Sequence, residues 1–359
     1  MLISILIPVF NDEQYIGACL RSVTAQDWSD CEILLCDDGS SDGSLSACRA
    51  FEALYPGRVR VFHHPENRGP LLTRRDLFAG AYGEYLFCVD ADDELMPGAL
   101  EILKEAAGKT GADMILFDAV CVRPDGSEDR IGPGLEDGRL YAGEEKAAVL
   151  EQACTGRDIG CMWLRIFRRS IADLEEDYSP WQPLVIGEDR FQSYPLFDRA
   201  ASVYCLHAPL YRYIKRGDGL TGHFREDFYD LRKILWERED RYFASWNIRP
   251  ECVEEIFRRR CSEIINHLGR KRFTGSPKLF LEEAGRIRQD GLFGEYCSKT
   301  TLPPRYRRYG QLLLGGRLTL LYLALNAERQ AAGPARKVRA LLGKGGRICG
   351  SGSFPCSGS

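Results

Sequence analysis

Apolar residues in the first third of the chain follow two alternating patterns. Five short apolar runs, rich in β-branched and aromatic residues, predict strands that are covered on both faces. These runs occupy residues 3–10, 31–36, 58–64, 84–90 and 113–120. Between them apolar residues recur at helical spacing, as Ile16, Leu20 and Val23 do. Strands separated by helices predict right-handed βαβ crossovers, so we expect an α/β fold with a mostly parallel sheet flanked by helices.

Local signals predict where helices and turns lie. Ser44 is a helix-capping residue type ahead of an apolar stripe, Gly83 ends a helical segment, and Pro97 is typical of a first helical position. After residue 121 the alternation stops, and Asp125-Gly126 predicts the turn of a hairpin.

The later part of the chain has a different pattern. A strand-like run at 202–214 precedes amphipathic helical patterns from about 225 to 295. We therefore expect a first domain over residues 1–220 and a helical C-terminal extension over 221–345. The low-complexity tail, 346–359, is expected to be disordered.

Composition narrows the function classes. The net charge is −4 and the pI is near 5.9, so no overall positive field favours nucleic acid as a partner. The 14 cysteines include no CxxC pair and no zinc spacing, which indicates core thiols. The N-terminus has no basic region ahead of its apolar run, which favours a leaderless, cytoplasmic protein.

One late segment raises the question of a membrane. Residues 311–328 are apolar but are interrupted by glycines and an arginine, so they are too short and too polar for a spanning helix. Basic stretches flank them, and residues 304–343 could therefore lie on a membrane surface, at the inner face of the cell membrane. A helix packed on the protein body with solvated flanks is the alternative.

Acidic residues follow two of the predicted strands. Asp37-Asp38 ends the second strand, and a D-x-D-D pattern of Asp90, Asp92 and Asp93 ends the fourth. Ligands of open α/β sheets bind at these carboxyl ends. Clustered carboxylates suit Mg²⁺ or Mn²⁺ together with substrate phosphates, whereas an isolated D-x-D would more often be a solvated loop or a helix start before Pro97.

Five motifs occur together and in order along the chain. They are "SILIPVFNDEQYIGACLRSVTAQ", "EILLCDDGSSDGS", "NRG", "GEYLFCVDADDELMPGALE" and "GEDRF". With them the chain closely resembles the family 2 glycosyltransferases, densely over residues 1–120 and more thinly to about 215. The resemblance implies a GT-A fold (Rossmann-like) and an inverting, metal-dependent hexosyltransferase that uses a nucleotide-diphosphate sugar with Mg²⁺ or Mn²⁺.

The resemblance also implies the donor-binding residues. Pro8, Phe10 and Asn11, at the end of the first strand, correspond to the cradle of the nucleotide base. Asp38 corresponds to the acceptor for the base edge, while Asp37 organises the turn. Arg75 of "TRRD" is the expected match to an Ala-Arg-Asn stretch of the family, although Asp76 then replaces an amide.

The D-x-D motif and the later motifs imply the catalytic centre. Asp90 corresponds to a donor contact, and Asp92 with Asp93 to the metal and diphosphate contacts. Asp189 corresponds to the catalytic base, with Glu188 as its rival or as an acceptor contact.

Two further segments of the resemblance concern the acceptor and the diphosphate. Trp163, in "MWLRIFRRS", corresponds to a position near the acceptor. Lys215 or Arg216, after the last strand, could fold over the diphosphate.

These residues suggest a place in cell-surface polysaccharide or lipid-linked glycan assembly, by analogy with the family. Two other classes stay open. A nucleotidylyltransferase would need a Gly-rich phosphate loop with a basic residue near the first strand, which "PVFNDEQ" lacks. A non-catalytic nucleotide-sugar-binding relative would lack the base or the D-x-D, both of which are present.

Overall fold

The computed structural model describes residues 3–155, 158–182, 184–216, 227–270, 273 and 275–342, with side chains up to 330. Among these residues the chain forms two compact units. The first comprises the residues up to 216 together with Asp230–Arg249, and the second comprises 227–229 and the residues from Pro250 onward. The predicted tail, 346–359, lies outside the described residues.

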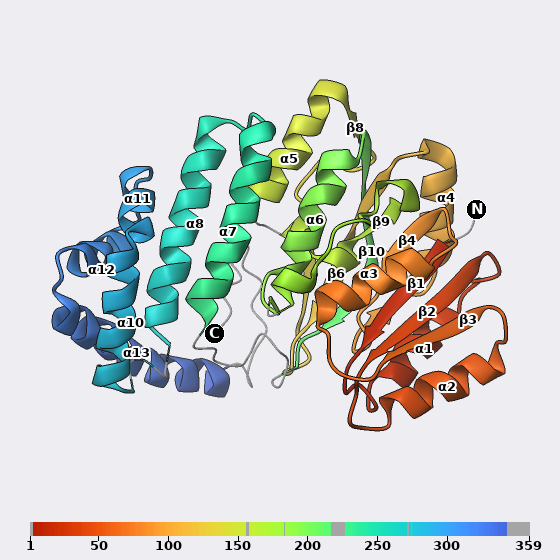
Figure 1. Cartoon of the computed structure of the whole chain (residues 1–359), viewed down its shortest axis with the longest axis horizontal. Coiled ribbons are helices and arrows are strands. Elements are labelled where there is room, and N and C mark those ends of the chain that lie inside the picture. Colours follow the sequence, from red (N-terminus) through yellow and green to blue (C-terminus); the bar gives the residue numbers. More distant parts are fainter. Residues whose placement is uncertain are drawn as a thin grey trace. The chain divides into compact units, whose positions relative to one another are not determined.

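A single mixed sheet forms the centre of the first unit (Figure 1). Its strands are β1 (Ile3–Val9), β2 (Cys31–Asp38), β3 (Val59–His64), β4 (Tyr85–Cys88), β5 (Glu94–Leu95), β6 (Met114–Val122), β7 (Glu128–Ile131), β8 (Leu140–Ala142), β9 (Arg165–Arg168) and β10 (Ser202–Ile214). The order is β3-β2-β1-β4-β9-β6-β10-β5, with β7 beside β6 and β8 beside β10. The neighbours among β1, β2, β3 and β4 are parallel, as are β6 and β10. The five predicted strands and the mostly parallel α/β sheet are therefore confirmed.

One strand departs from the expected alternation. β9 lies between β4 and β6 and is antiparallel to both. The fourth and fifth predicted strands are thus not neighbours, because a segment from much later in the chain separates them.

The helices of the first unit are α1 (Ile16–Thr24), α2 (Ser44–Leu54), α3 (Pro70–Gly80), α4 (Ala99–Thr110), α5 (Lys146–Thr155) and α6 (Glu188–Arg199). Helix α7 (Phe228–Ser245) begins in the second unit, and its residues from Asp230 onward belong to the first. The remaining described helices of the second unit are α8 (Pro250–Leu268), α10 (Pro277–Asp290), α11 (Leu292–Ser298), α12 (Pro304–Leu314) and α13 (Leu318–Leu342).

Two local predictions have different outcomes. The hairpin turn is confirmed, since β6 and β7 pair around Gly126, whose φ is 81°. The Ser44 cap is wrong: Ser44 is the first residue of α2, and its own N–H donates to Asp42 Oδ1 at 3.0 Å. The Asp42 carboxylate therefore accepts from the first N–H of the helix, and Ser44 Oγ accepts from the N–H of Asp12 rather than from a helical N–H.

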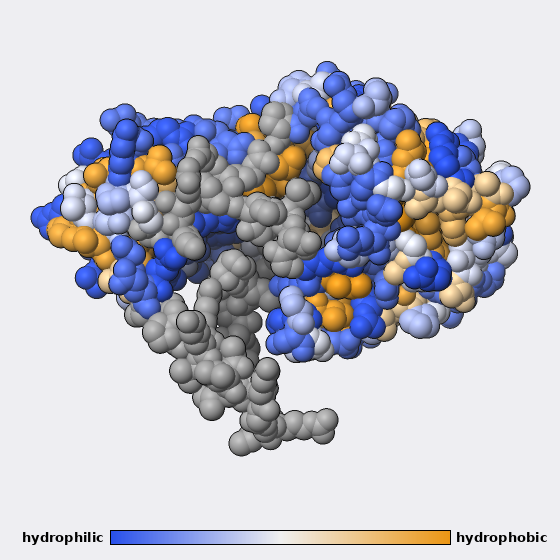
Figure 2. Space-filling view, turned by 90° about the horizontal axis from the view of Figure 1, so that it is seen from below, coloured by the Kyte–Doolittle hydropathy of each residue, from blue (hydrophilic) through white to orange (hydrophobic). Residues whose placement is uncertain are grey.

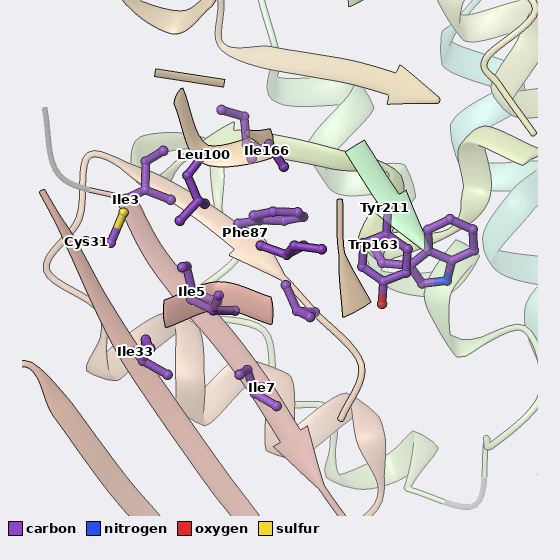
Figure 3. Close-up of a cluster of buried hydrophobic side chains, with 14 of the residues drawn as sticks. Ile3, Ile5, Ile7, Cys31, Ile33, Phe87, Leu100, Trp163, Ile166 and Tyr211 are labelled. Carbon is purple, nitrogen blue, oxygen red and sulfur yellow. The ribbon is translucent and has the colours of Figure 1, made fainter. Parts of the chain in front are cut away.

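The core explains why the apolar runs are continuous. Ile3, Ile5 and Ile7 point to one face of the sheet, where they join a cluster with α1 and α4 (Figure 3). The residues between them face α3 on the other side of the sheet. There Leu6 of β1 lies beside Leu34 of β2, and a Cβ on Gly80 of α3 would meet Leu34 at 3.4 Å. Both faces are covered, so no position along β1 needs to be strongly polar.

Candidate functional site

The loop after β1 is tied to the loop after β2. Asn11 has a φ of 57°, a left-handed conformation that is uncommon outside glycine. Its N–H donates to Ser40 Oγ at 3.0 Å, and its Oδ1 accepts from the Ser41 N–H at 2.8 Å. The side chain of Phe10 is 41% exposed beside this junction, and Pro8 is half-buried in β1. The junction therefore fixes one loop against the other and leaves an aromatic ring open to a ligand.

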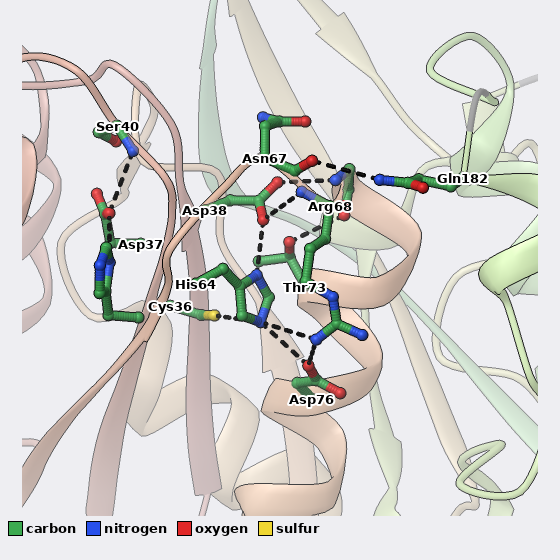
Figure 4. Close-up of polar contacts among 12 residues, drawn as sticks. Cys36, Asp37, Asp38, Ser40, His64, Asn67, Arg68, Thr73, Asp76 and Gln182 are labelled. Atoms are coloured by element: carbon green, nitrogen blue, oxygen red, sulfur yellow. Dashed lines mark hydrogen bonds and ion pairs between the residues drawn. The ribbon is translucent and has the colours of Figure 1, made fainter.

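Asp38 holds the loop after β3 (Figure 4). Its Oδ1 accepts from the N–H of Arg68 at 2.9 Å and lies 2.6 Å from His64 Nδ1, and its Oδ2 accepts from the N–H of Gly69 at 2.9 Å. The residue is 4% exposed. Both carboxylate oxygens of Asp38 accept hydrogen bonds from this loop, so the side chain holds the loop in place. The expected contact with a nucleotide base stays a prediction.

Asp37 is completely buried at the end of β2. Its Oδ2 accepts from the N–H of Ser40 at 3.2 Å, which agrees with the expected role in the turn. Its Oδ1 accepts no hydrogen bond from any residue that the structure describes. An acceptor with unused capacity therefore lies on Asp37 rather than on Asp38.

Arg75, the expected donor contact, is paired within its own helix turn. Its Nη2 lies 3.1 Å from Asp76 Oδ1, and Asp76 Oδ2 also accepts from Arg68 Nη1 at 2.8 Å. Asp76 thus joins a partly exposed ion-pair network with Arg68 and Arg75. The structure does not bring Arg75 to the acidic cluster.

Arg74, not Arg75, lies at the acidic cluster. Its side chain is buried, and its Nη1 lies 2.7 Å from Asp189 Oδ1. Its Nη2 lies 3.8 Å from Glu188 Oε1 and 4.0 Å from Asp90 Oδ1. Burial lowers the pKa of Arg74, but the three neighbouring carboxyl groups raise it above its ordinary value, so the guanidinium stays charged. One buried cation therefore connects the D-x-D turn with the GED motif.

Sequence reasoning missed Arg74 because helical spacing does not separate it from Arg75. Arg74 lies three residues from the buried Leu71 and Leu77, and Arg75 lies three residues from the buried Leu72 and Phe78. The distinction comes from the folded chain, which places the acids of α6 and of the D-x-D turn beside Arg74.

The three acids of the D-x-D-D pattern lie in different environments. Asp93 is 1% exposed, and it accepts from Tyr211 Oη at 2.9 Å and from the N–H of Ile214 at 2.7 Å. Burial, together with Asp90 and Asp92, raises the pKa of Asp93 to about 9. The expected metal contact of Asp93 stays a prediction that this geometry does not favour, because its carboxyl group is enclosed and hydrogen-bonded to β10.

Asp92 is the accessible member, with 38% of its side chain exposed. Arg216 Nη1 lies 3.0 Å from Asp92 Oδ2, and the Arg216 guanidinium lies 3.7 Å from the centre of the Tyr15 ring. Asp90 is half-buried, and burial raises its pKa to about 7, against the lowering effect of Arg74. An arginine of the segment after the last strand thus already lies at the acidic turn.

A divalent cation fits this site only together with substrate oxygens. Within the part of the chain that the structure describes, no group of three or more His, Cys, Asp and Glu side chains is arranged to hold a metal ion. Asp92, with 38% of its side chain exposed, and Asp90, with 28%, offer partly accessible carboxylates at the turn. Mg²⁺ commonly binds through one or two carboxylates plus substrate phosphates, which agrees with this arrangement.

Glu188 and Asp189 both face Arg74 from the first turn of α6. They follow Gly187, the residue before the helix, which has a left-handed conformation with a φ of 84°. Burial and the charge of Asp189 raise the pKa of Glu188 to about 8, although Arg74 lowers it, so Glu188 holds its proton more readily than an ordinary glutamate does. Asp189 has the shorter ion pair and also accepts from the N–H of Met162 at 3.4 Å. The expected role of Asp189 as the base, with Glu188 as its rival or as an acceptor contact, stays a prediction.

Trp163 supports the site from the core. It lies in a 3₁₀ turn, Met162–Leu164, and is 5% exposed. Its indole stacks on the rings of Tyr211 and Tyr213, with centroid distances of 4.7 and 5.2 Å. The expected contact with an acceptor is not favoured, because the ring is enclosed by the aromatic residues that hold Asp93.

The described helices include none that is both long and apolar enough to cross a bilayer.

The family model that matches this chain and the relatives that it resembles are glycosyltransferases. Residues 4–172 match the family model described as "Glycosyl transferase family 2". The putative glycosyltransferase EpsH of Bacillus subtilis is 26% identical over 320 residues, which cover 87% of this chain and 90% of that protein. The GalNAc(5)-diNAcBac-PP-undecaprenol beta-1,3-glucosyltransferase of Campylobacter jejuni is 30% identical over 137 residues, which cover 37% of this chain and 43% of that protein.

The fold also has a solved counterpart. The crystal structure of residues 1–349 of S. aureus TarS in complex with UDP-GlcNAc has a TM-score of 0.60, with 17% identity over 92% of each chain. At this identity the likeness concerns the fold.

Proposed function

This chain belongs to glycosyl transferase family 2, and we propose that it transfers a sugar with inversion from a nucleotide-diphosphate donor to an acceptor hydroxyl. The GT-A fold and glycosyltransferase activity follow from the family and the structural match. The single observation that supports the mechanism is Arg74, which lies 2.7 Å from Asp189 and 4.0 Å from Asp90. It brings a candidate base and the D-x-D turn to one place.

Asp189 would act as the general base. Its carboxylate would take the proton of the acceptor hydroxyl while the acceptor oxygen bonds to the anomeric carbon. The bond from that carbon to the diphosphate would break on the opposite face of the sugar. Arg74 fixes the carboxylate in direction, and Glu188, whose pKa is raised by burial and by the charge of Asp189, can donate a hydrogen bond to a sugar or acceptor oxygen when it is protonated.

Charge on the leaving diphosphate also needs compensation. Asp92 would hold Mg²⁺ or Mn²⁺ at the diphosphate, where such an ion neutralises negative charge. Arg216, which now pairs with Asp92, is placed to turn to the phosphate oxygens when they arrive. The nucleotide would lie along the loops after β1 and β2, with its base on the exposed ring of Phe10.

The donor and the metal can be tested by thermal shift. We expect a UDP, GDP or dTDP sugar to raise the melting temperature in the presence of Mn²⁺ or Mg²⁺, because a ligand at 100 times its Kd stabilises the native state by about 2.7 kcal/mol. Asp92→Asn should lose the metal-dependent part of the shift. TarS is known with UDP-GlcNAc, which makes that sugar the first donor to try. If no donor gives a metal-dependent shift, the proposed site is wrong.

We propose a lipid-linked or cell-surface glycan as the acceptor. The Campylobacter relative is named for an undecaprenol-linked substrate. In the second unit, Leu320 and Leu323 are more than half exposed and lie one helical turn apart on α13, close in sequence to the exposed Arg317. Figure 2 shows further apolar patches separated by hydrophilic side chains on the face in view. These leucines and arginines support the proposed membrane contact through residues 304–343, of which 343 lies outside the described residues.

The membrane contact has its own test. Sedimentation with vesicles of phosphatidylglycerol should capture more of the protein than phosphatidylcholine vesicles do, because cationic flanks add electrostatic attraction. Leu320→Glu with Leu323→Glu should reduce capture by about tenfold. Leu54→Glu, at an exposed leucine of the first unit, is the control. Equal capture of all three proteins would refute the membrane contact.

A further inference from the structure

The helix that carries Asp189 contains a proline in its interior. Pro195 lies in the second half of α6, and a proline has no N–H to donate. In an α-helix the N–H of residue 195 would bond to the carbonyl of residue 191. The carbonyl oxygen of Phe191, two residues beyond Asp189, is therefore deprived of its helical donor.

Arg238 of α7 supplies the missing donor. Its Nε donates to the carbonyl oxygen of Phe191 at 2.8 Å, and its guanidinium lies 4.0 Å from the centre of the Phe191 ring. Only 8% of the Arg238 side chain is exposed. A buried hydrogen bond from a charged donor to an otherwise unsatisfied carbonyl is among the stronger kinds.

Glu176 fixes Arg238 in turn. Its two carboxylate oxygens lie 2.5 and 2.6 Å from Nη1 and Nη2 of Arg238, a bidentate pair. All of these residues belong to the first unit. The guanidinium is thus held in a single orientation by Glu176 on one edge and by the Phe191 carbonyl on the other.

The same helix also packs against the start of α6. A Cβ on Gly187 would lie 2.7 Å from Leu235 Cδ2, so α7 contacts the backbone just before Glu188 and Asp189. Tyr194 Oη donates to Glu239 Oε1 at 2.8 Å. Helix α7 therefore contacts the chain at Gly187, before Asp189, and at Tyr194, after it. The hydrogen bond from Arg238 to Phe191 lies between these two contacts along α6.

We propose that Arg238, held by Glu176, is a positioning residue that sets the direction of the first turn of α6 and thereby of Asp189. The proposal rests on the proposed function, since it assigns Arg238 a role through the base. Pro195 leaves the Phe191 carbonyl without its helical donor, and the hydrogen bond from Arg238 to this carbonyl holds the first turn of α6 in the direction that brings Asp189 to Arg74. The Tyr194–Glu239 and Leu235 contacts keep the two helices packed when Arg238 is replaced.

The test compares Arg238→Met with Arg249→Met. Arg249 forms a bidentate pair with Glu151 of α5, with distances of 2.5 and 2.6 Å, and is the matched control. With the donor that gives the largest thermal shift, we expect Arg238→Met to lower kcat by about 10- to 100-fold, as small displacements of catalytic groups do. The KM for the donor should change by less than about twofold, because no donor contact is lost. Arg249→Met should leave both constants unchanged.

A rescue experiment identifies the cause. Pro195→Ala restores an N–H opposite the Phe191 carbonyl, so in the Arg238→Met background it should recover much of the lost kcat. Amide hydrogen exchange of residues 188–192 should be faster in Arg238→Met and should slow again in the double variant, whatever the substrate. If Arg238→Met does not fold, Glu176→Gln takes its place with the same expected direction.

Three results would overturn the proposal. They are an unchanged kcat in Arg238→Met, unchanged exchange over residues 188–192, or no recovery with Pro195→Ala. Failure of the proposed function would look different: Asp189→Asn would then remain active while Arg238→Met still accelerated exchange in α6.

Discussion

Asp189→Asn should lower kcat by about 10²- to 10⁴-fold, the range that removal of a general base costs. The amide keeps the size of the side chain, and its single acceptor oxygen can keep the contact with either Arg74 or the Met162 N–H, so we expect the fold and donor binding to persist. The ability to accept the acceptor's proton is lost together with one of these two contacts. Steady-state kinetics with the screened donor, alongside its thermal shift, measure the two effects separately.

Glu188→Gln is the matched control for this experiment. Glu188 adjoins Asp189 and faces the same arginine, but burial and the charge of Asp189 raise its pKa and favour its protonated, neutral form. An amide resembles the protonated acid, so we expect a change of no more than about tenfold, the loss of one hydrogen bond. A larger loss in Glu188→Gln than in Asp189→Asn would show that the roles of the two acids are exchanged.

Arg74→Met should be the most damaging single substitution in the site. The methionine fills much of the same volume but leaves Asp90, Glu188 and Asp189 without their shared cation. Breaking a buried ion pair by removing one partner costs about 3–5 kcal/mol, and this loss should appear in the free energy of unfolding measured with urea. The kcat should also fall by about 10²-fold or more, since the direction of Asp189 is no longer fixed.

The neighbouring arginine provides the comparison. Arg75→Met removes only a partly exposed pair with Asp76, which should cost less than about 1 kcal/mol and leave kcat nearly unchanged. If Arg75→Met were the more harmful of the two, the assignment made from the sequence would be right and the structural one wrong.

The strands and the acidic edge of the sheet could be predicted from the sequence because their signals are local. A continuous apolar run such as Ile3–Val9 is typical of a strand with both faces covered, and parallel strands bring their following loops to one edge. The family motifs added Asp189, which no local pattern distinguishes from an ordinary acid at a helix start.

What the sequence could not reveal depends on distant partners. Asp93 is buried while Asp92 is partly exposed because the carboxyl group of Asp93 accepts a hydrogen bond from Tyr211, a residue far along the chain. Arg165 is fully buried within a strand, and its Nη2 is satisfied by backbone carbonyls, including that of Cys161 at 2.7 Å. Neither outcome follows from hydrophobic periodicity, since each requires a partner that only the folded chain brings near.

The position of β9 has a consequence for the order in which the protein can assemble. β4 and β6 are separated in the sheet by residues 165–168, which follow both of them in the chain. During synthesis, β1 to β4 can pair as soon as they emerge, but β4 keeps an unpaired edge until β9 is made. Strand β6 waits for β9 and also for β10, which follows β9 in the chain and pairs along the whole of β6. Unpaired edges invite contacts with other chains, so the nascent protein is most exposed to misassembly between the completion of β6 and the arrival of β10.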